Sequence, residues 1–190
     1  MGVLEEIGAK DSKQLTPAKR ERIYKQLIEN AVEYVTLHLS AQEIDKKRNI
    51  ASLNDIEQQS MLEVLKKMKI TPDEIYVDAA DVKEERFGKA FEKQFPNAKV
   101  VSKHKADSLY LVVSAASIIA KVERDREIEK IRKKIGDEIG SGYPSDPKTR
   151  AFLKRYYLKH HRFPSFVRKS WDTVNKIREE CSKKTLADYF

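Results

Sequence analysis

The chain has 190 residues, a length that suits one domain with a hydrophobic core rather than two. It carries a formal net charge of +8, and 36% of its residues are charged. Its single cysteine, Cys181, excludes an intramolecular disulfide and a multi-cysteine zinc site. Residues 109–120, the longest nearly apolar stretch, are too few to span a bilayer, and no secretory signal opens the chain, so we expect a protein of the cytoplasm.

Helix and strand patterns alternate along the chain, which predicts an α/β fold with helices packed on a largely parallel sheet. Thr16 followed by Pro17 is an N-cap with proline at the first helical position, and Ser40 with Glu43 has the spacing of a capping box. The predicted elements, in chain order, are a helix from Pro17 through Ala31, a strand over 32–39, a second long helix through Met61 and Met68, a strand over 74–78, a helix over 84–95, a strand over 99–102 and a long helix from about Ser108 to Lys134.

The segment EIYVDAAD, residues 74–81, ends a strand pattern on carboxylates. Ile75 and Val77 alternate with polar neighbours, as in a half-buried strand, whereas Asp78 and Asp81 are poor strand formers. A polar turn that leaves the sheet would explain both aspartates. The alternative is that a carboxylate is delivered to a functional site where the strand ends.

Asp107 lies in the segment HKADSLYLVVSAASIIAKVERD, at the predicted start of the long helix. It has the position of an N-cap, but a cap leaves the preceding His104 and Lys105 unexplained. If the strands over 74–78 and 99–102 are neighbours, their carboxyl ends bring Asp78 and Asp107 to one edge of the sheet. Two carboxylates there could hold Mg²⁺ or Mn²⁺, with a phosphodiester supplying the remaining ligands.

The positive charge is concentrated near the C-terminus. The segment from Lys148 to Lys184 contains twelve Lys or Arg and three acids, a net charge of +9, so the rest of the chain sums to −1. Aromatic residues such as Tyr156, Tyr157 and Trp171 are mixed with these charges. Cationic and aromatic side chains together predict a nucleic-acid-binding face, and a solvated helix whose aromatics are core is the alternative.

The loop GSGYPSDP, residues 140–147, predicts an unusual backbone. Gly140 and Gly142 permit positive φ or close approach, and Pro144 favours an extended Tyr143 whose ring can project from the loop. An ordinary turn is the alternative.

Together, KDSK at 10–13, YVDAADV at 76–82, the HKAD motif with the helix that follows it, and GSGYPSDP resemble ribonuclease HII, especially its archaeal members. The resemblance runs along essentially the whole chain. It implies a ribonuclease H-like mixed sheet flanked by helices, with a C-terminal helical extension. It also implies an endoribonuclease that hydrolyses the RNA strand of RNA–DNA hybrids and cuts 5′ of ribonucleotides embedded in duplex DNA.

The resemblance assigns roles to individual residues. Asp78 and Asp107 match metal-binding carboxylates of a two-metal hydrolysis that uses Mg²⁺ or Mn²⁺, whereas Asp81 is expected to serve the turn. Tyr143 matches the residue that packs on the deoxyribose at the RNA–DNA junction. Residues expected on the phosphate side of the substrate, for which a solvated-surface position stays open except at Lys13, are Lys10, Ser12, Lys13, His104, Lys105 and Lys121.

The sequence also departs from the family pattern. The family opens with a strand that carries an Asp-Glu pair, followed by a glycine-arginine-glycine element, and nothing here matches them, so these first strands are expected to be missing. Leu111 stands where the family usually has proline. With two carboxylates, the chain alone is expected to bind at most one cation weakly and to cleave slowly. A truncated, non-catalytic remnant that binds RNA–DNA hybrids is the alternative.

Three regions are predicted along the chain, an N-terminally incomplete core, a basic helical extension and a tail, over 1–147, 148–180 and 181–190. In the tail, Leu186, Tyr189 and Phe190 have i, i+3, i+4 spacing, so one helical turn would present them as an apolar plug. The tail is similar to the sliding-clamp-binding peptides of archaeal replication and repair proteins, although Lys183 stands where glutamine is usual. A frayed terminus is the alternative.

Overall fold

The computed structural model describes residues 2–9, 15–136 and 138–187. The chain divides into two compact units, one made of Met1–Leu37 and Ser52–Arg124 and the other of His38–Ala51 and Asp125–Phe190. None of the helices in the described ranges is long and apolar enough to cross a membrane. The predicted region boundaries after residues 147 and 180 stay predictions.

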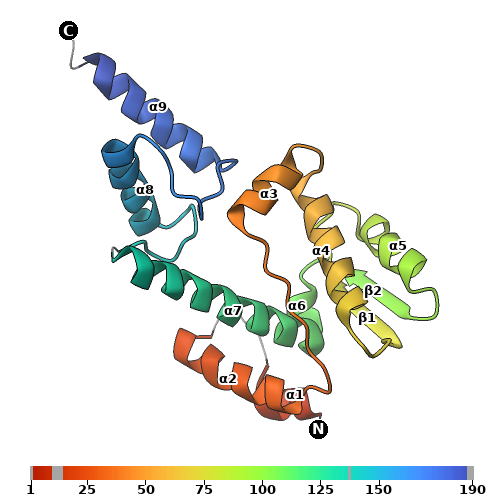
Figure 1. The fold of residues 1–190 in the computed structure, drawn as a ribbon. Helices are drawn as coiled ribbons and strands as arrows, with labels where there is room; N and C mark the ends of the chain where they lie inside the picture. Colours follow the sequence, from red (N-terminus) through yellow and green to blue (C-terminus); the bar gives the residue numbers. More distant parts are fainter. Residues whose placement is uncertain (1, 10–14, 137, 188–190) are drawn as a thin grey trace. The chain divides into compact units, whose positions relative to one another are not determined.

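The first unit holds a two-stranded sheet (Figure 1). β1 and β2 pair in parallel, from Glu74 opposite Lys99 to Asp78 opposite Lys103, which confirms that the two predicted strands are neighbours. A parallel pair needs a crossover connection, and α5 provides it. The elements of this unit are α1 (Val3–Ile7), α2 (Pro17–Asn30), α4 (Leu53–Lys67), β1 (Glu74–Asp78), α5 (Glu84–Gln94), β2 (Lys99–Lys103), α6 (Ala106–Leu109) and the first part of α7 (Leu111–Ile135).

Two hydrophobic clusters stabilise the first unit. In one, Ile75 of β1 packs with Phe87 and Phe91 of α5, which are 1% and 0% exposed, and α4 borders this cluster. In the other, Ile23 of α2 and Ile118 of α7 are fully buried. Each such side chain contributes about 1.5–3 kcal/mol of hydrophobic free energy. The first cluster therefore fixes the crossover helix on the sheet and, with it, the loops at the carboxyl ends of the strands.

The predicted strand over residues 32–39 is wrong. Its residues alternate between exposed and half-buried, but among the described residues no backbone ladder pairs them with another strand. The segment is anchored at Glu33, whose carboxylate accepts hydrogen bonds from the N–H groups of Lys69 (2.9 Å) and Ile70 (3.1 Å). These backbone hydrogen bonds lower the pKa of Glu33. Alternation predicts the exposure pattern of a strand, whereas a strand also needs a neighbour that the local sequence does not specify.

The long helix predicted after the HKAD motif is two helices. α6 ends at Leu109, and Tyr110 is extended (φ −126°, ψ 122°) before α7 begins at Leu111. The carbonyl of Tyr110 accepts a hydrogen bond from the N–H of Val113 (3.1 Å), which starts the new helix. Proline suits the first position of a helix, and the residue before a proline favours an extended backbone. The proline usual in the family would therefore suit this backbone, and Leu111 starts α7 in its place.

Helices form the second unit. The core of this unit includes Phe152 of α8 and Val174 of α9, with Val167 from the segment that joins these helices. Asp45 of α3 attaches to the same segment, because its carboxylate accepts a hydrogen bond from the N–H of Lys169 (2.6 Å). The predicted basic extension is thus two helices separated by residues 161–171. The elements of this unit are α3 (Ala41–Arg48), the last part of α7, α8 (Pro147–His160) and α9 (Asp172–Ala187).

Candidate active site

Asp78 lies at the carboxyl end of β1, beside the end of β2. The N–H of Ala79 donates to the carbonyl of Lys103 (2.9 Å), which extends the parallel ladder past Asp78. The N–H of Ala106 donates to Asp78 Oδ1 (3.1 Å). Asp78 is half-buried, and within the described ranges its Oδ2 accepts no hydrogen bond. One carboxylate oxygen is therefore fixed by the backbone, and the other can bind a ligand.

Asp107 is the second residue of α6 rather than its N-cap, so the capping explanation is wrong. The N-cap is Lys105, whose φ of 55° and ψ of 35° lie in the left-handed region. A non-glycine residue there costs about 1–2 kcal/mol. This turn directs the N–H of Ala106 to Asp78 and leaves Asp107, the next residue, only 7% exposed. The structure thus brings the two predicted carboxylates to one edge of the sheet.

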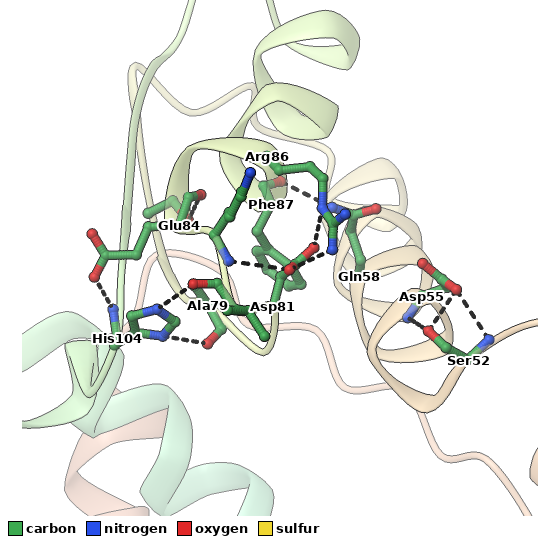
Figure 2. Close-up of polar contacts among 12 residues, drawn as sticks. Ser52, Asp55, Gln58, Ala79, Asp81, Glu84, Arg86, Phe87 and His104 are labelled. Carbon is green, nitrogen blue, oxygen red and sulfur yellow. Dashed lines mark hydrogen bonds and ion pairs between the residues drawn. The ribbon is translucent and has the colours of Figure 1, made fainter.

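Asp81 belongs to the loop between β1 and α5 and stabilises that loop. Its carboxylate accepts hydrogen bonds from Arg86 Nε and Nη2 (both 2.6 Å) and from the N–H of Lys83 (3.1 Å). Figure 2 shows the guanidinium facing this carboxylate. The hydrogen bonds from Arg86 hold the pKa of Asp81 below its usual value. Asp81 therefore serves the turn, as the sequence predicted.

His104 faces the same loop (Figure 2). Its Nδ1 lies 3.2 Å from the carbonyl oxygen of Ala79, its Nε2 lies 3.4 Å from that of Val82, and its backbone N–H donates to Glu84 Oε1 (2.7 Å). Because carbonyl oxygens only accept, the N–H of a neutral ring points at one of them, and the shorter distance favours Nδ1 as the donor. The ring holds the loop in this structure, and its predicted contact with a substrate phosphate stays a prediction.

The remaining predicted contacts are spread over the chain. Lys105 is exposed beside Asp107, Lys121 is half-buried on α7, and Leu186 lies in the last turn of α9. Predicted site residues that lie outside the described residues are Lys10, Ser12, Lys13, Tyr189 and Phe190.

Hydrogen bonds fix the backbone of the loop around Tyr143. Gly140 and Gly142 both have positive φ (67° and 74°), as predicted. The carboxylate of Asp146, the N-cap of α8, accepts hydrogen bonds from the N–H (2.6 Å) and hydroxyl (2.7 Å) of Ser141. These bonds lower the pKa of Asp146 to about 2. Their stabilisation is therefore present above the usual carboxyl pKa and is lost as the pH falls through about 2. Tyr143 itself is 46% exposed.

The basic segment surrounds a hollow of about 540 Å³ within the second unit. Its lining includes the cationic side chains of Arg162, Lys169 and Arg178 and the aromatic ring of Tyr156, and no carboxylate of the described residues lines it. The guanidinium of Arg178 also lies 6.0 Å from the centre of the Phe163 ring. Positive charge beside aromatic surface is what phosphate contacts and base stacking require.

The carboxylate pair suits a divalent cation bound through oxygen. Mg²⁺ and Mn²⁺ prefer carboxylate and water oxygens, and Mg²⁺ keeps several waters, so a protein commonly supplies only one or two ligands. The half-buried Asp78 offers its Oδ2, which accepts no hydrogen bond from the described residues. In the part of the chain that the structure describes, no group of three or more His, Cys, Asp or Glu is placed to hold a metal ion. The carboxylates that the structure brings to this edge are Asp78 and Asp107, and their role as metal ligands stays a prediction.

Sequence reasoning missed Glu84 and Arg86, which fix the loops on either side of the carboxylates. Glu84 binds the end of β2 from the first turn of α5, and Arg86 binds Asp81 from the same helix. An acidic residue in a first helical turn usually indicates a favourable interaction with the helix dipole. No local spacing predicts a partner twenty residues away, so the sequence held no signal for the first of these contacts.

The chain is similar to known proteins in sequence and in fold. The family model described as Ribonuclease HII matches residues 1–174. A ribonuclease HII of Thermococcus onnurineus is 48% identical over 182 residues, which are 95% of this chain and 79% of that protein. The crystal structure of the ribonuclease H2 from Pyrococcus horikoshii matches with a TM-score of 0.87 and 46% identity, over 95% of this chain and 84% of that one.

A second solved structure is that of the PCNA:RNase HII complex from Archaeoglobus fulgidus, with a TM-score of 0.81 and 40% identity over 92% of this chain and 82% of that one. These matches confirm the predicted ribonuclease H-like fold, of which the described residues form a small sheet, flanking helices and a C-terminal helix. Its sequence and its fold show that the chain belongs to the ribonuclease HII family of endonucleases.

Proposed function

We propose that this protein hydrolyses the RNA strand of RNA–DNA hybrids and cuts 5′ of ribonucleotides embedded in duplex DNA. The observation that carries the proposal is the hydrogen bond from the Ala106 N–H to Asp78 Oδ1 (3.1 Å), because it joins the two carboxylate-bearing segments of a ribonuclease HII family member at one edge of the sheet.

Asp78 and Asp107 are the residues that would hold Mg²⁺ or Mn²⁺. A divalent cation bound there makes water more acidic and stabilises negative charge on phosphate oxygens, and the family resemblance extends this to a two-metal hydrolysis. Asp78 presents its Oδ2 while the backbone holds its Oδ1, and Asp107 is itself only 7% exposed. Two carboxylates balance the charge of one divalent cation. Holding a second divalent cation would therefore require further anionic ligands, of which the substrate phosphate would be one.

Substrate selection is assigned to the residues around this edge and to the Tyr143 loop. Tyr143 is proposed to pack on the deoxyribose at the RNA–DNA junction, and its partial exposure leaves ring surface for that contact. Lys105 offers its ammonium group beside Asp107, and Lys121 is a further proposed phosphate contact. The KDSK residues Lys10, Ser12 and Lys13 complete the proposed phosphate side.

The function is tested by cleavage of matched duplexes. One carries a single ribonucleotide in DNA, a second is an RNA–DNA hybrid, and a third is DNA throughout. We expect cuts 5′ of the ribonucleotide and along the RNA strand, with Mg²⁺ or Mn²⁺ and not with EDTA, and no cut in the third duplex. Binding of the first two duplexes without any cleavage would show the non-catalytic alternative instead.

Binding to the duplex should weaken steeply as salt rises if the basic hollow contacts phosphates. Each phosphate contact adds about 0.9 to the slope of log affinity against log salt, so replacing Arg162, Lys169 and Arg178 by glutamine should lower the slope by up to about 2.7. The measurement is fluorescence anisotropy between about 50 and 200 mM salt.

The matched control removes the same charge elsewhere, from three exposed lysines of α2 and α4, Lys19, Lys25 and Lys66. This control should leave the slope nearly unchanged. Equal slopes for the two triple variants would show that the side chains lining the hollow make no phosphate contacts.

We further propose that the C-terminal tail binds a replication sliding clamp. Support comes from the spacing of Leu186, Tyr189 and Phe190 and from the solved complex of a ribonuclease HII with PCNA. A peptide of residues 181–190 should bind a cognate clamp, and replacing both Tyr189 and Phe190 by alanine should abolish that binding in isothermal calorimetry. Equal affinity of the two peptides would remove the idea.

A further inference from the structure

We infer that Glu84 and His104 are positioning residues that hold Asp107 in register with Asp78. The expected effect on kcat rests on the proposed function. The expected effect on metal affinity rests on the geometry of the loop after β1 and the turn before Asp107.

Glu84 joins the loop after β1 to the end of β2 through three contacts. Its Oε1 accepts a hydrogen bond from the N–H of His104 (2.7 Å), and its Oε2 accepts one from Lys103 Nζ (2.9 Å). Its backbone carbonyl accepts a third from the hydroxyl of Ser102 (2.8 Å). The N–H of His104 is the principal cause of the lowered pKa of Glu84, followed by the hydrogen bond from Lys103. The first residue of α5 thus binds three consecutive residues of the chain that leads to Asp107.

His104 makes the reciprocal connection. Its ring lies between the carbonyl oxygens of Ala79 (3.2 Å) and Val82 (3.4 Å), so it binds the loop that leaves Asp78. Figure 2 shows the Glu84 carboxylate facing the backbone N–H of His104, while the ring of His104 faces the carbonyl of Ala79. Between the two carbonyl groups that the ring contacts, Asp81 is held by its paired hydrogen bonds with Arg86. The loop after Asp78 and the turn before Asp107 are therefore tied together.

This connection matters because metal ligands must be held closely. Ligand geometry has to stay within about 0.5 Å of the productive arrangement, and removing an outer partner of a metal site typically costs 10–100-fold in metal affinity or activity. Only two residues, the left-handed Lys105 and Ala106, separate Glu84's main partner, His104, from Asp107. Without the anchor at His104, the turn can relax from this strained backbone and move Asp107 away from Asp78.

The test compares Glu84→Ala with Glu85→Ala. Both carboxylates lie in the first turn of α5, so both variants lose the same interaction with the helix dipole, but Glu85 is exposed and, in the described chain, accepts no hydrogen bond from β2. Glu84→Gln is the conservative variant, because its amide oxygen still accepts from the N–H of His104. The readouts are Mn²⁺ affinity by calorimetry, kcat and KM on a duplex with one ribonucleotide, and melting temperature.

We expect Glu84→Ala to lower Mn²⁺ affinity and kcat by about tenfold or more, with KM within about threefold of the parent. Glu84→Gln should recover most of the Mn²⁺ affinity and most of kcat, and Glu85→Ala should match the parent in both. His104→Ala should behave like Glu84→Ala, whereas a phosphate contact at His104 would raise KM instead.

The inference is overturned if Glu84→Ala and Glu85→Ala have the same Mn²⁺ affinity. It is also overturned if Glu84→Gln keeps the parental melting temperature and yet recovers neither Mn²⁺ affinity nor kcat. A parent protein that binds Mn²⁺ but cuts none of the duplexes would refute the proposed function alone, and the Mn²⁺ affinities of the four variants would still decide this inference.

Discussion

Asp78→Asn should lower kcat/KM on a duplex with one ribonucleotide by at least about 1,000-fold, a loss of about 4 kcal/mol of transition-state stabilisation. The substitution removes the negative charge that a divalent cation requires and leaves the shape of the side chain unchanged. The amide oxygen can still accept the hydrogen bond from the Ala106 N–H, so the fold should be retained. Mn²⁺ affinity measured by calorimetry should fall in parallel with the rate.

Two further variants separate charge from structure at this position. Asp78→Ala loses the hydrogen bond to Ala106 as well, so its free energy of unfolding should be about 1 kcal/mol lower than that of Asp78→Asn, with the same loss of activity. Asp81→Asn removes a carboxylate three residues away that is already paired with Arg86. It should therefore retain most of the activity.

Asp107→Asn should resemble Asp78→Asn, because the buried carboxylate contributes the other half of the charge at this edge. Full activity of either asparagine variant, or a larger loss in Asp81→Asn than in Asp78→Asn, would show that the metal ligands are assigned wrongly. The second result would move the site into the loop after β1.

The strand that ends on Asp78 could be predicted because its signals are local. Alternation of Ile75 and Val77 fixed the element type, and the two expected parallel strands placed Asp78 and Asp107 at the same edge. The positive φ of Gly140 was predicted for the same reason, since only the local backbone determines where glycine is required. Most of these successes concern features whose physical cause lies within one short segment, and the pairing of β1 with β2 is the exception.

The errors have the opposite origin. Residues 32–39 carry a strand pattern, but pairing depends on a neighbour elsewhere in the chain. The break at Tyr110 interrupts a helix that periodicity alone would continue from α6 into α7. The contact of Glu84 with His104 joins residues 20 apart, and no spacing rule links them. These features arise when the chain folds back on itself at the carboxyl ends of β1 and β2, which is where the site is built.

Gly140→Ala should lower the free energy of unfolding by about 2–4 kcal/mol and the melting temperature by about 5–15 °C. The backbone of Gly140 has a φ of 67°, which an L-residue rarely adopts. An added Cβ would also lie 2.6 Å from Asp146 Oδ2 and 2.7 Å from the N–H nitrogen of Thr149. Both neighbours belong to the start of α8, and Asp146 is held by its hydrogen bonds to Ser141. The clash cannot be relieved by turning one flexible side chain.

The matched control is Gly136→Ala, because Gly136 has almost the same φ (68°) and nothing lies within 4 Å of its added Cβ. This variant isolates the cost of the backbone conformation, about 1–2 kcal/mol, so the difference between the two variants measures the crowding at the Tyr143 loop. If Tyr143 packs on the substrate, Gly140→Ala should also raise KM for the duplex when activity is measured below the melting temperature of the variant protein. Gly136→Ala should leave KM unchanged. Equal free energies of unfolding of the two variants would mean that the loop moves freely. Tyr143 would then not be held in one position, and the proposed selection of the RNA–DNA junction by its ring would fail.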